Sequence, residues 1–398
     1  MRIKPFVAWR PPADRVSKVA SPPYDVVDTA EARRLAGNNT DCFFHISRPD
    51  IDLPDGTDLH SPPLYAAAAK AYADFKRRGV LVQAGRPALY LYRLEWGSHR
   101  QTGLFAVCAV ADYDRDVIKK HEKTRPAPED DRTRHILAVR AHTGPVLLTY
   151  RDVPALNRHV AAEEQRSPLY DFTAPDGIRH TLWEASDPGA VTRAFDAVPV
   201  AYIADGHHRA AASARVAREA GTEESRWFLA VLFPASQLKI LPYNRCVRDL
   251  NGLSADRFLA AVRERFTLRP ATQPAPDRPG RVCLRLGDAW HELTWNPVGG
   301  ADPVSVLDVS VLQERLLSPV LGIEDPRRDP RIEFVGGIRG TGELEERVRS
   351  GRAAVAFSMY PTTVDQLMAI SDAGRIMPPK STWFEPKLRD GLLCHDID

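Results

Sequence analysis

Five consecutive residues, Asp205 to Arg209, stand between an apolar run and an alanine-rich run in the stretch YIADGHHRAAASARVAREAG. The apolar run predicts a strand and the alanines predict a helix, so Gly206 would lie at the turn where the helix begins. Such a turn directs unpaired backbone N–H groups and the positive end of the helix dipole at one point. Gly206 allows a phosphate group to approach the backbone, while His207, His208 and Arg209 add donors and positive charge. We predict a phosphate-binding turn; the alternative is that Asp205 caps the helix and the histidines are surface residues.

The charged segment IKKHEKTRPAPEDDRTRH, from Ile118 to His135, is the second candidate. Its basic residues are candidates for binding phosphate groups: Lys120, Arg125 and Arg132. Its carboxylates are candidates for holding Mg²⁺: Glu122, Asp130 and Asp131. Carboxylates near phosphate oxygens are what phosphoryl transfer requires. The two prolines predict that no regular helix runs through the middle of the segment. The alternative is a solvated surface, which most charged runs form.

Three further segments contain polar side chains near prolines. In SPPYDVVD, residues 21–28, the prolines would hold Tyr24 and Asp25 on a stiff loop facing a substrate, or Asp25 would cap the next helix. In MPPKSTWFEPKL, residues 377–388, Lys380 would reach an anion, or the segment would pack on the core. In LKILPYNRCV, Asn244 and Arg245 are weaker candidates, and we interpret this segment as structural.

Composition excludes several classes of protein. The 398 residues carry 54 Lys+Arg against 52 Asp+Glu, a net charge of +2, which is too balanced for a general nucleic-acid binder. No apolar run approaches the roughly 20 residues that span a bilayer, and no secretory signal follows the basic N-terminus. We therefore expect a cytoplasmic protein without a membrane segment, and its oligomeric state stays open. The five cysteines form no CxxC pair, which argues against a structural metal.

Strand and helix patterns alternate along the chain, which predicts an α/β or α+β fold with mixed sheets and interspersed helices. We expect residues 1–197 to form an N-terminal region that contains the SPPYD and KKHEKTR loops. Residues 198–398 would form a second region, which contains the DGHHR turn. The proline-rich stretch ATQPAPDRPG, residues 271–280, is expected to be a loop.

The motifs ASPPYDVV, IKKHEKTR with EDDRTRH, IADGHHR, LKILPYNR and MPPKSTWFEPKL resemble the bacterial and archaeal family catalogued as domain of unknown function 1015. The family name assigns no activity. The DGHHR turn with its helix is also similar to the nucleotide-binding turn of the ParB/sulfiredoxin superfamily, and especially to archaeal free serine kinase. That resemblance implies a ParB/sulfiredoxin-like nucleotide-binding unit.

Together these observations predict a small-molecule kinase that transfers a phosphoryl group from ATP or ADP, with Mg²⁺, to the hydroxyl of serine or a similar small hydroxy or amino acid. Asp205 or Glu122 would be the general base. Lys380 would pair with a substrate carboxylate. Two alternatives remain: a nucleotide-binding regulatory module without turnover, and a hydrolase or lyase acting on a phosphorylated metabolite with His121 or His207 as acid or base.

Overall fold

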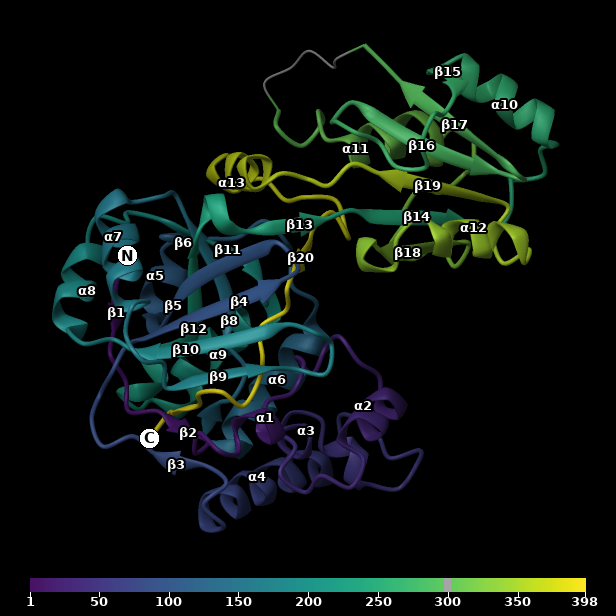
Figure 1. Ribbon diagram of the computed structural model, residues 1–398. Helices are drawn as coiled ribbons and strands as arrows, with labels where there is room; N and C mark the ends of the chain where they lie inside the picture. The colour runs from purple at the N-terminus through teal and green to yellow at the C-terminus, as the bar shows by residue number, and fades with distance from the viewer. Residues whose placement is uncertain (297–301) are drawn as a thin grey trace. The chain divides into compact units, whose positions relative to one another are not determined.

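The computed structural model describes residues 1–296 and 302–398, which fold into two compact units (Figure 1). Unit 1 comprises Met1–Leu238 together with Pro386–Asp398, and unit 2 comprises Lys239–Glu385. Both combine mixed or antiparallel sheets with helices, as the alternating sequence pattern predicted. The predicted boundary between residues 197 and 198 falls inside unit 1. No helix in the described part of the chain is long and apolar enough to cross a membrane.

Unit 1 is built on a nine-stranded mixed sheet. In spatial order its strands are β6 (Ile118–Lys119), β11 (Ala201–Asp205), β8 (Val146–Tyr150), β12 (Trp227–Pro234), β5 (His99–Ala109), β4 (Tyr90–Trp96), β10 (Arg179–Glu184) and β9 (Tyr170–Thr173), with β1 (Ile3–Lys4) also pairing with β5. The neighbours β6 and β11 run parallel, as do β8 and β12, and the other pairs are antiparallel. Two short pairs complete the strands of unit 1: β2 (Trp9–Arg10) with β3 (Val82–Gln83), and β7 (Ala141–His142) with β21 (His395–Asp396).

The helices of unit 1 pack against this sheet and in a second core. They are α1 (Val16–Val19), α2 (Thr29–Ala36), α3 (Phe44–Ser47), α4 (Pro62–Arg77), α5 (Val110–Asp114), α6 (Pro126–Val139), α7 (Pro154–Glu163), α8 (Pro188–Phe195) and α9 (His207–Ala220), with short 3₁₀ turns at Pro49–Asp52, Glu224–Arg226 and Ala235–Gln237. Alternating residues of the central strands form one apolar face, which packs against Leu156 of α7, Phe195 of α8 and Ala210 of α9. A second core joins α4, α6 and the N-terminal segment to Cys394 near the C-terminus.

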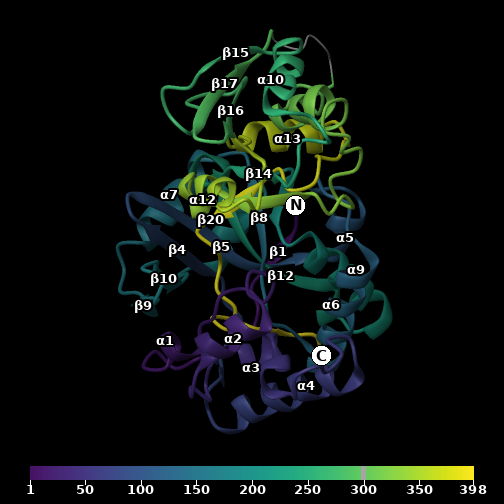
Figure 2. The same cartoon turned by 90° about the vertical axis from the view of Figure 1, so that its right-hand side faces the viewer.

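The C-terminal segment of unit 1 (yellow in Figures 1 and 2) runs beside the N-terminal segments (purple). The backbone of Asp390 exchanges hydrogen bonds with that of Ser21, and the backbone of Cys394 does so with Trp9. Further along, Asp396 accepts hydrogen bonds from Tyr72 and from the indole of Trp9. Residues more than 300 positions apart in the sequence are therefore held together in one unit.

Unit 2 contains a six-stranded antiparallel sheet. Its strands are, in spatial order, β15 (Thr267–Pro270), β17 (Ala289–Thr294), β16 (Arg281–Leu286), β19 (Val355–Met359), β14 (Tyr243–Val247) and β18 (Ile332–Gly336), and β13 (Lys239–Leu241) pairs separately with β20 (Trp383–Glu385). Its helices are α10 (Ala255–Arg263), α11 (Asp308–Leu312), α12 (Gly342–Arg349) and α13 (Val364–Asp372), with a π-helical turn at Gln313–Leu317 and a 3₁₀ turn at Gly337–Arg339. The predicted loop at residues 271–280 connects β15 to β16.

One local prediction was wrong. The segment that we expected to be irregular because of its prolines contains α6, which begins at Pro126 and continues through the charged residues to Val139. Pro126 and Pro128 both lie in the first turn of the helix, where a backbone N–H has no intrahelical partner to lose. The prolines therefore start this helix rather than interrupt it.

Candidate functional site

The turn between β11 and α9 has the predicted strand–glycine–helix form. Gly206 precedes the first helical residue with φ of +92°, a conformation that side chains with a Cβ rarely adopt. A Cβ at this position would also lie 3.0 Å from Nε of Arg209. Gly206 is the N-cap residue of α9 and has no side chain that could cap the helix. The phosphate-binding turn and the alternative in which Asp205 caps the helix both stay predictions. A helix N-terminus that begins at a glycine is a common binding place for an anion.

Arg209 is the central cation of the turn. Its side chain is buried, and its Nη2 lies 3.0 Å from Asp205 Oδ2 and 3.7 Å from Asp25 Oδ2. Its Nη1 donates a hydrogen bond to the carbonyl of Pro145. Burial alone would lower the pKa of Arg209, but the carboxylates of Asp25 and Asp205 outweigh it and raise that pKa. The guanidinium is thus a permanent positive charge held beside two carboxylates from different segments.

The loop between β6 and α6 lies against the same turn. Because β6 and β11 are adjacent and parallel, their carboxyl ends meet at one edge of the sheet. The backbone N–H of His121 points to Nε2 of His207 at 3.4 Å, and that of Arg125 donates to Nε2 of His208 at 3.1 Å. The sheet therefore brings two of the predicted segments together.

The two histidines facing each other at this junction are buried and neutral. The rings of His121 and His207 meet edge to face with centroids 4.4 Å apart. Burial lowers the pKa of His121 to about 4. Burial also lowers the pKa of His207 well below its usual value, and the neighbouring imidazole and guanidinium add to this effect. A histidine with such a pKa is unprotonated at neutral pH, which disfavours the alternative in which either residue acts as a general acid.

The SPPYD loop brings Tyr24 and Asp25 to Arg209. The guanidinium of Arg132 lies 3.9 Å from the centroid of the Tyr24 ring, and Arg132 also pairs with Asp131. Burial raises the pKa of the Tyr24 phenol, so it remains a neutral donor. Arg132 thus contacts the SPPYD loop, where it supports Tyr24.

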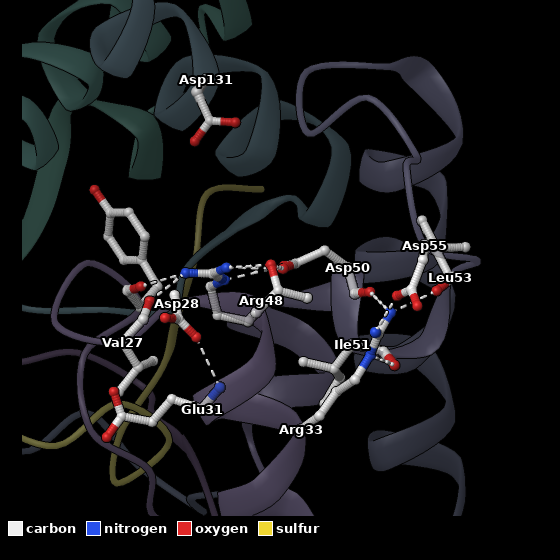
Figure 3. A network of polar contacts seen from close by, with 12 residues as sticks. Val27, Asp28, Glu31, Arg33, Arg48, Asp50, Ile51, Leu53, Asp55 and Asp131 are labelled. Carbon is white, nitrogen blue, oxygen red and sulfur yellow. Dashed lines mark hydrogen bonds and ion pairs between the residues drawn. The ribbon is translucent and has the colours of Figure 1, made fainter.

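Arg48, which the sequence analysis did not select, fixes the same loop (Figure 3). Its Nη1 donates to the carbonyl oxygens of Tyr24 and Val27, its Nη2 donates to Thr29 Oγ1 at 3.0 Å, and Nη2 and Nε reach Asp50 at 2.8 and 3.0 Å. One guanidinium therefore satisfies backbone carbonyls that a loop would otherwise leave unpaired. In the sequence, Arg48 is a single arginine outside the quoted motifs, so no local pattern marked it as a candidate.

Other predicted residues lie elsewhere. Lys120 pairs with Asp116 at 2.8 Å and donates to the carbonyl of Tyr113, so it points to α5. Arg125 is exposed, and it meets the turn through its backbone N–H. Lys380 belongs to unit 2, whereas the turn belongs to unit 1.

The predicted metal ligands do not form a cluster. Asp130 pairs with Arg215 of α9, and Asp131 is held by Arg132 and by the hydroxyl of Tyr65 at 3.0 Å. Glu122 is the member beside the turn: its side chain is 54% exposed, and its Oε2 lies 3.9 Å from Nδ1 of His207. Within residues 1–296 and 302–398, no group of three or more His, Cys, Asp or Glu side chains is arranged to hold a metal ion.

The C-terminal segment supplies two residues that sequence reasoning missed. Lys387 Nζ lies 3.8 Å from Asp205 Oδ1, and the buried Asp390 lies within the electrostatic reach of Arg209, Asp25 and Arg132. Lys387 stands inside the MPPKSTWFEPKL motif, seven residues after Lys380. That motif pointed to the right segment, but it did not show which of its two lysines returns to unit 1.

Comparisons with known proteins place the chain in a family. A family model described as a protein of unknown function, DUF1015, matches residues 3–310. No curated protein matches. One similar solved structure is a conserved hypothetical protein from Pyrococcus furiosus, with 13% sequence identity and a TM-score of 0.35; the match covers 72% of this chain and 95% of that one. A mutant free serine kinase in complex with ADP has 14% identity and a TM-score of 0.35, and the match covers 72% of this chain and 92% of that one. A third is SbnI with a C-terminal truncation from Staphylococcus aureus, with 13% identity and a TM-score of 0.39; the match covers 72% of this chain and 85% of that one.

Proposed function

The chain belongs to the DUF1015 family of proteins of unknown function, and we propose that it is a nucleotide-dependent phosphotransferase acting on the hydroxyl of a small hydroxy or amino acid, such as serine. The observation that carries this proposal is the glycine turn at the N-terminus of α9, where the buried Arg209 lies beside the carboxylates of Asp25 and Asp205. An anion site beside two carboxylates provides both a place for the donor phosphates and an acceptor for the proton that the attacking hydroxyl loses.

The phosphate end of the site is the turn itself. Gly206 lets the phosphate oxygens approach the backbone N–H groups of His207 and His208, and Arg209 supplies the charge. Phosphoryl transfer needs little covalent participation from the protein, so positioning and neutralisation by these groups account for most of the expected catalysis.

The acceptor end is formed by the SPPYD loop. Tyr24 and Asp25 would line the position of the small hydroxylated substrate, and Asp205 would take the hydroxyl proton as the oxygen forms its bond to phosphorus and the nucleotide leaves. Asp205 is half-buried at the end of β11, with Lys387 and Arg209 on its two oxygens. These cations orient the carboxylate.

Magnesium would arrive with the nucleotide. Mg²⁺ is usually held by one or two carboxylates together with substrate phosphates, and Glu122 is the exposed carboxylate next to His207. The carboxylate oxygens of Glu122 would suit Mg²⁺, a hard cation, and the bound cation would neutralise part of the phosphate charge.

The test is to incubate the purified protein with ATP or ADP, Mg²⁺ and a pool of small hydroxylated metabolites, and to search for a new phosphomonoester by phosphorus NMR. We expect a nucleotide-dependent product that disappears in Asp205→Asn. The double variant His208→Ala with Arg209→Ala should bind nucleotide more than about tenfold more weakly in calorimetry. Arg218→Ala is the matched control, because Arg218 is an exposed arginine further along the same helix.

Each alternative has its own signature. Nucleotide binding without any product would favour the regulatory module. Turnover of a phosphorylated metabolite without added nucleotide would favour the hydrolase or lyase. Unchanged nucleotide affinity in the double variant would contradict the assignment of the phosphate site.

A further inference from the structure

A small cavity of ≈ 20 Å³ in unit 1 is bordered by Arg209. Four of its lining side chains come from four separate segments, are more than nine-tenths buried, and carry a polar atom without a hydrogen-bond partner: Ser47 Oγ, His142 Nε2, Arg209 Nε and Asp390 Oδ1. Buried polar atoms are nearly always paired, so four unpaired ones around a single cavity require an explanation. A cavity of this size accommodates one water molecule.

Asp390 is the acidic member of this cluster, and the proposed reaction does not use it. Backbone hydrogen bonds to Ser21, at 3.0 and 3.2 Å, fix its position. A Cβ on Gly144 would lie 2.8 Å from Asp390 Oδ1, so the carboxyl group requires a glycine at that position. The carboxyl group is therefore placed with little freedom to move away from Arg209.

The charge of Asp390 depends on its neighbours. Burial raises its pKa to about 7, the charge of Arg209 opposes this rise, and the carboxylate of Asp25 adds to it. Its surroundings contain these titratable or charged groups from the packed segments: Tyr24, Asp25, Arg132, His135, His142 and Arg209. Of these, Arg209 is the one that the proposed function assigns to the incoming phosphate.

We propose that Asp390 takes up a proton from solvent when a phosphate group binds at Arg209, so that anion binding and protonation of the buried carboxyl group are coupled. This inference rests on the phosphate site of the proposed function. An anion at the guanidinium cancels part of the field that keeps Asp390 ionised, and the carboxyl group then favours its neutral form. By linkage, the affinity for nucleotide falls as pH rises above the pKa of the free site, by at most about tenfold per pH unit.

The experiment is calorimetric titration of the full chain with ADP at about pH 8, in two buffers that differ in ionisation enthalpy. The difference in observed enthalpy gives the number of protons taken up. We expect close to one proton for the wild type and close to none for Asp390→Asn, which retains every histidine near the turn and so isolates the carboxyl group. Asp114→Asn, at an exposed carboxylate of the same unit, should behave as the wild type.

The outcomes separate the two proposals. ADP binding without proton uptake by the wild type overturns this inference and leaves the phosphate site intact. Equal uptake by the wild type and Asp390→Asn overturns the assignment to Asp390. Absence of ADP binding by the wild type overturns the phosphate site itself, and the inference with it. A wild-type protein that binds ADP without taking up a proton contradicts the inference by itself. The test therefore does not depend on how well Asp390→Asn folds.

Discussion

Both units bury arginine side chains, and two of these, Arg209 of unit 1 and Arg245 of unit 2, differ in what surrounds them. Arg209 of unit 1 lies beside the carboxylates of Asp25 and Asp205. Arg245 of unit 2 donates to the backbone carbonyls of Tyr243 and Lys380 and lies against the ring of Phe334. The pKa of Arg209 is raised, whereas burial lowers that of Arg245 to about 10.

The two guanidinium groups therefore have different kinds of partner. A guanidinium with carbonyl partners completes backbone hydrogen bonds at the end of a strand. A guanidinium with carboxylate partners at a helix N-terminus contributes to a strong local field, which is what the proposed phosphate site needs. The sequence analysis predicted a site at Arg209 and interpreted the segment around Arg245 as structural, with Arg245 as a weaker candidate; both stay predictions.

The largest expected effect is on the pH dependence of stability. Burial lowers the pKa of four histidines of unit 1, to about 4 for His121, His135 and His395 and to about 3 for His142. Because burial depresses these values below the usual 6.5, the unfolded chain binds protons first as pH falls. Each histidine therefore removes up to about 3 kcal/mol of stability between pH 6.5 and 4.

Unit 2 contains one histidine, His291, which is only partly buried. Hydrogen exchange at pH 7 and at about pH 5 should accordingly show a much larger loss of protection in unit 1 than in unit 2. Equal losses of protection in both units would contradict the expected difference in their pH dependence.

The second effect concerns the two arginines directly. Arg209→Met removes the guanidinium that Asp25 and Asp205 share and should lower the free energy of unfolding of unit 1 by about 3–5 kcal/mol. Arg245→Met removes a buried charge that has no carboxylate partner and should change the stability of unit 2 by about 1 kcal/mol or less. Urea unfolding of both variants tests the contrast, and similar losses would contradict it.

A third pair of variants compares loops. Arg48→Lys should lower stability by about 2 kcal/mol, because a lysine cannot replace the several hydrogen bonds that one guanidinium makes. It should also weaken phosphoryl transfer through Tyr24 and Asp25.

Arg331 is the matched residue of unit 2. It fixes a loop through Asp329 and the carbonyls of Leu321 and Gly322. Arg331→Lys should lower stability by a similar amount and leave ADP binding and turnover unchanged. Loss of turnover in this variant would show that unit 2 takes part in the reaction.

The smallest effect is at the start of α13 in unit 2, where Thr363 and Gln366 form a capping box. Thr363→Ala should cost about 1 kcal/mol and leave the affinity for ADP unchanged. Thermal unfolding followed by calorimetry with ADP measures both quantities.

Local patterns were enough to predict the strand, glycine and helix around Gly206, because alanine propensity and an apolar run act over short distances. They failed at Pro126, where prolines that can interrupt a helix instead begin one. They could not reach Lys387 and Asp390, which return to unit 1 from the far end of the chain by tertiary pairing. Nor could they show that Lys380, only seven residues before Lys387, belongs to unit 2.

The most direct test of the phosphate site uses the two glycines at the ends of α9. Gly206 and Gly221 both have positive φ, but a Cβ at Gly206 would lie 3.0 Å from Arg209, whereas a Cβ at Gly221 would meet nothing within 4 Å. Calorimetric titration with ADP should show at least about tenfold weaker binding for Gly206→Ala and an unchanged affinity for Gly221→Ala. Equal affinities of the two variants for ADP, or no binding by the wild type, would contradict the account.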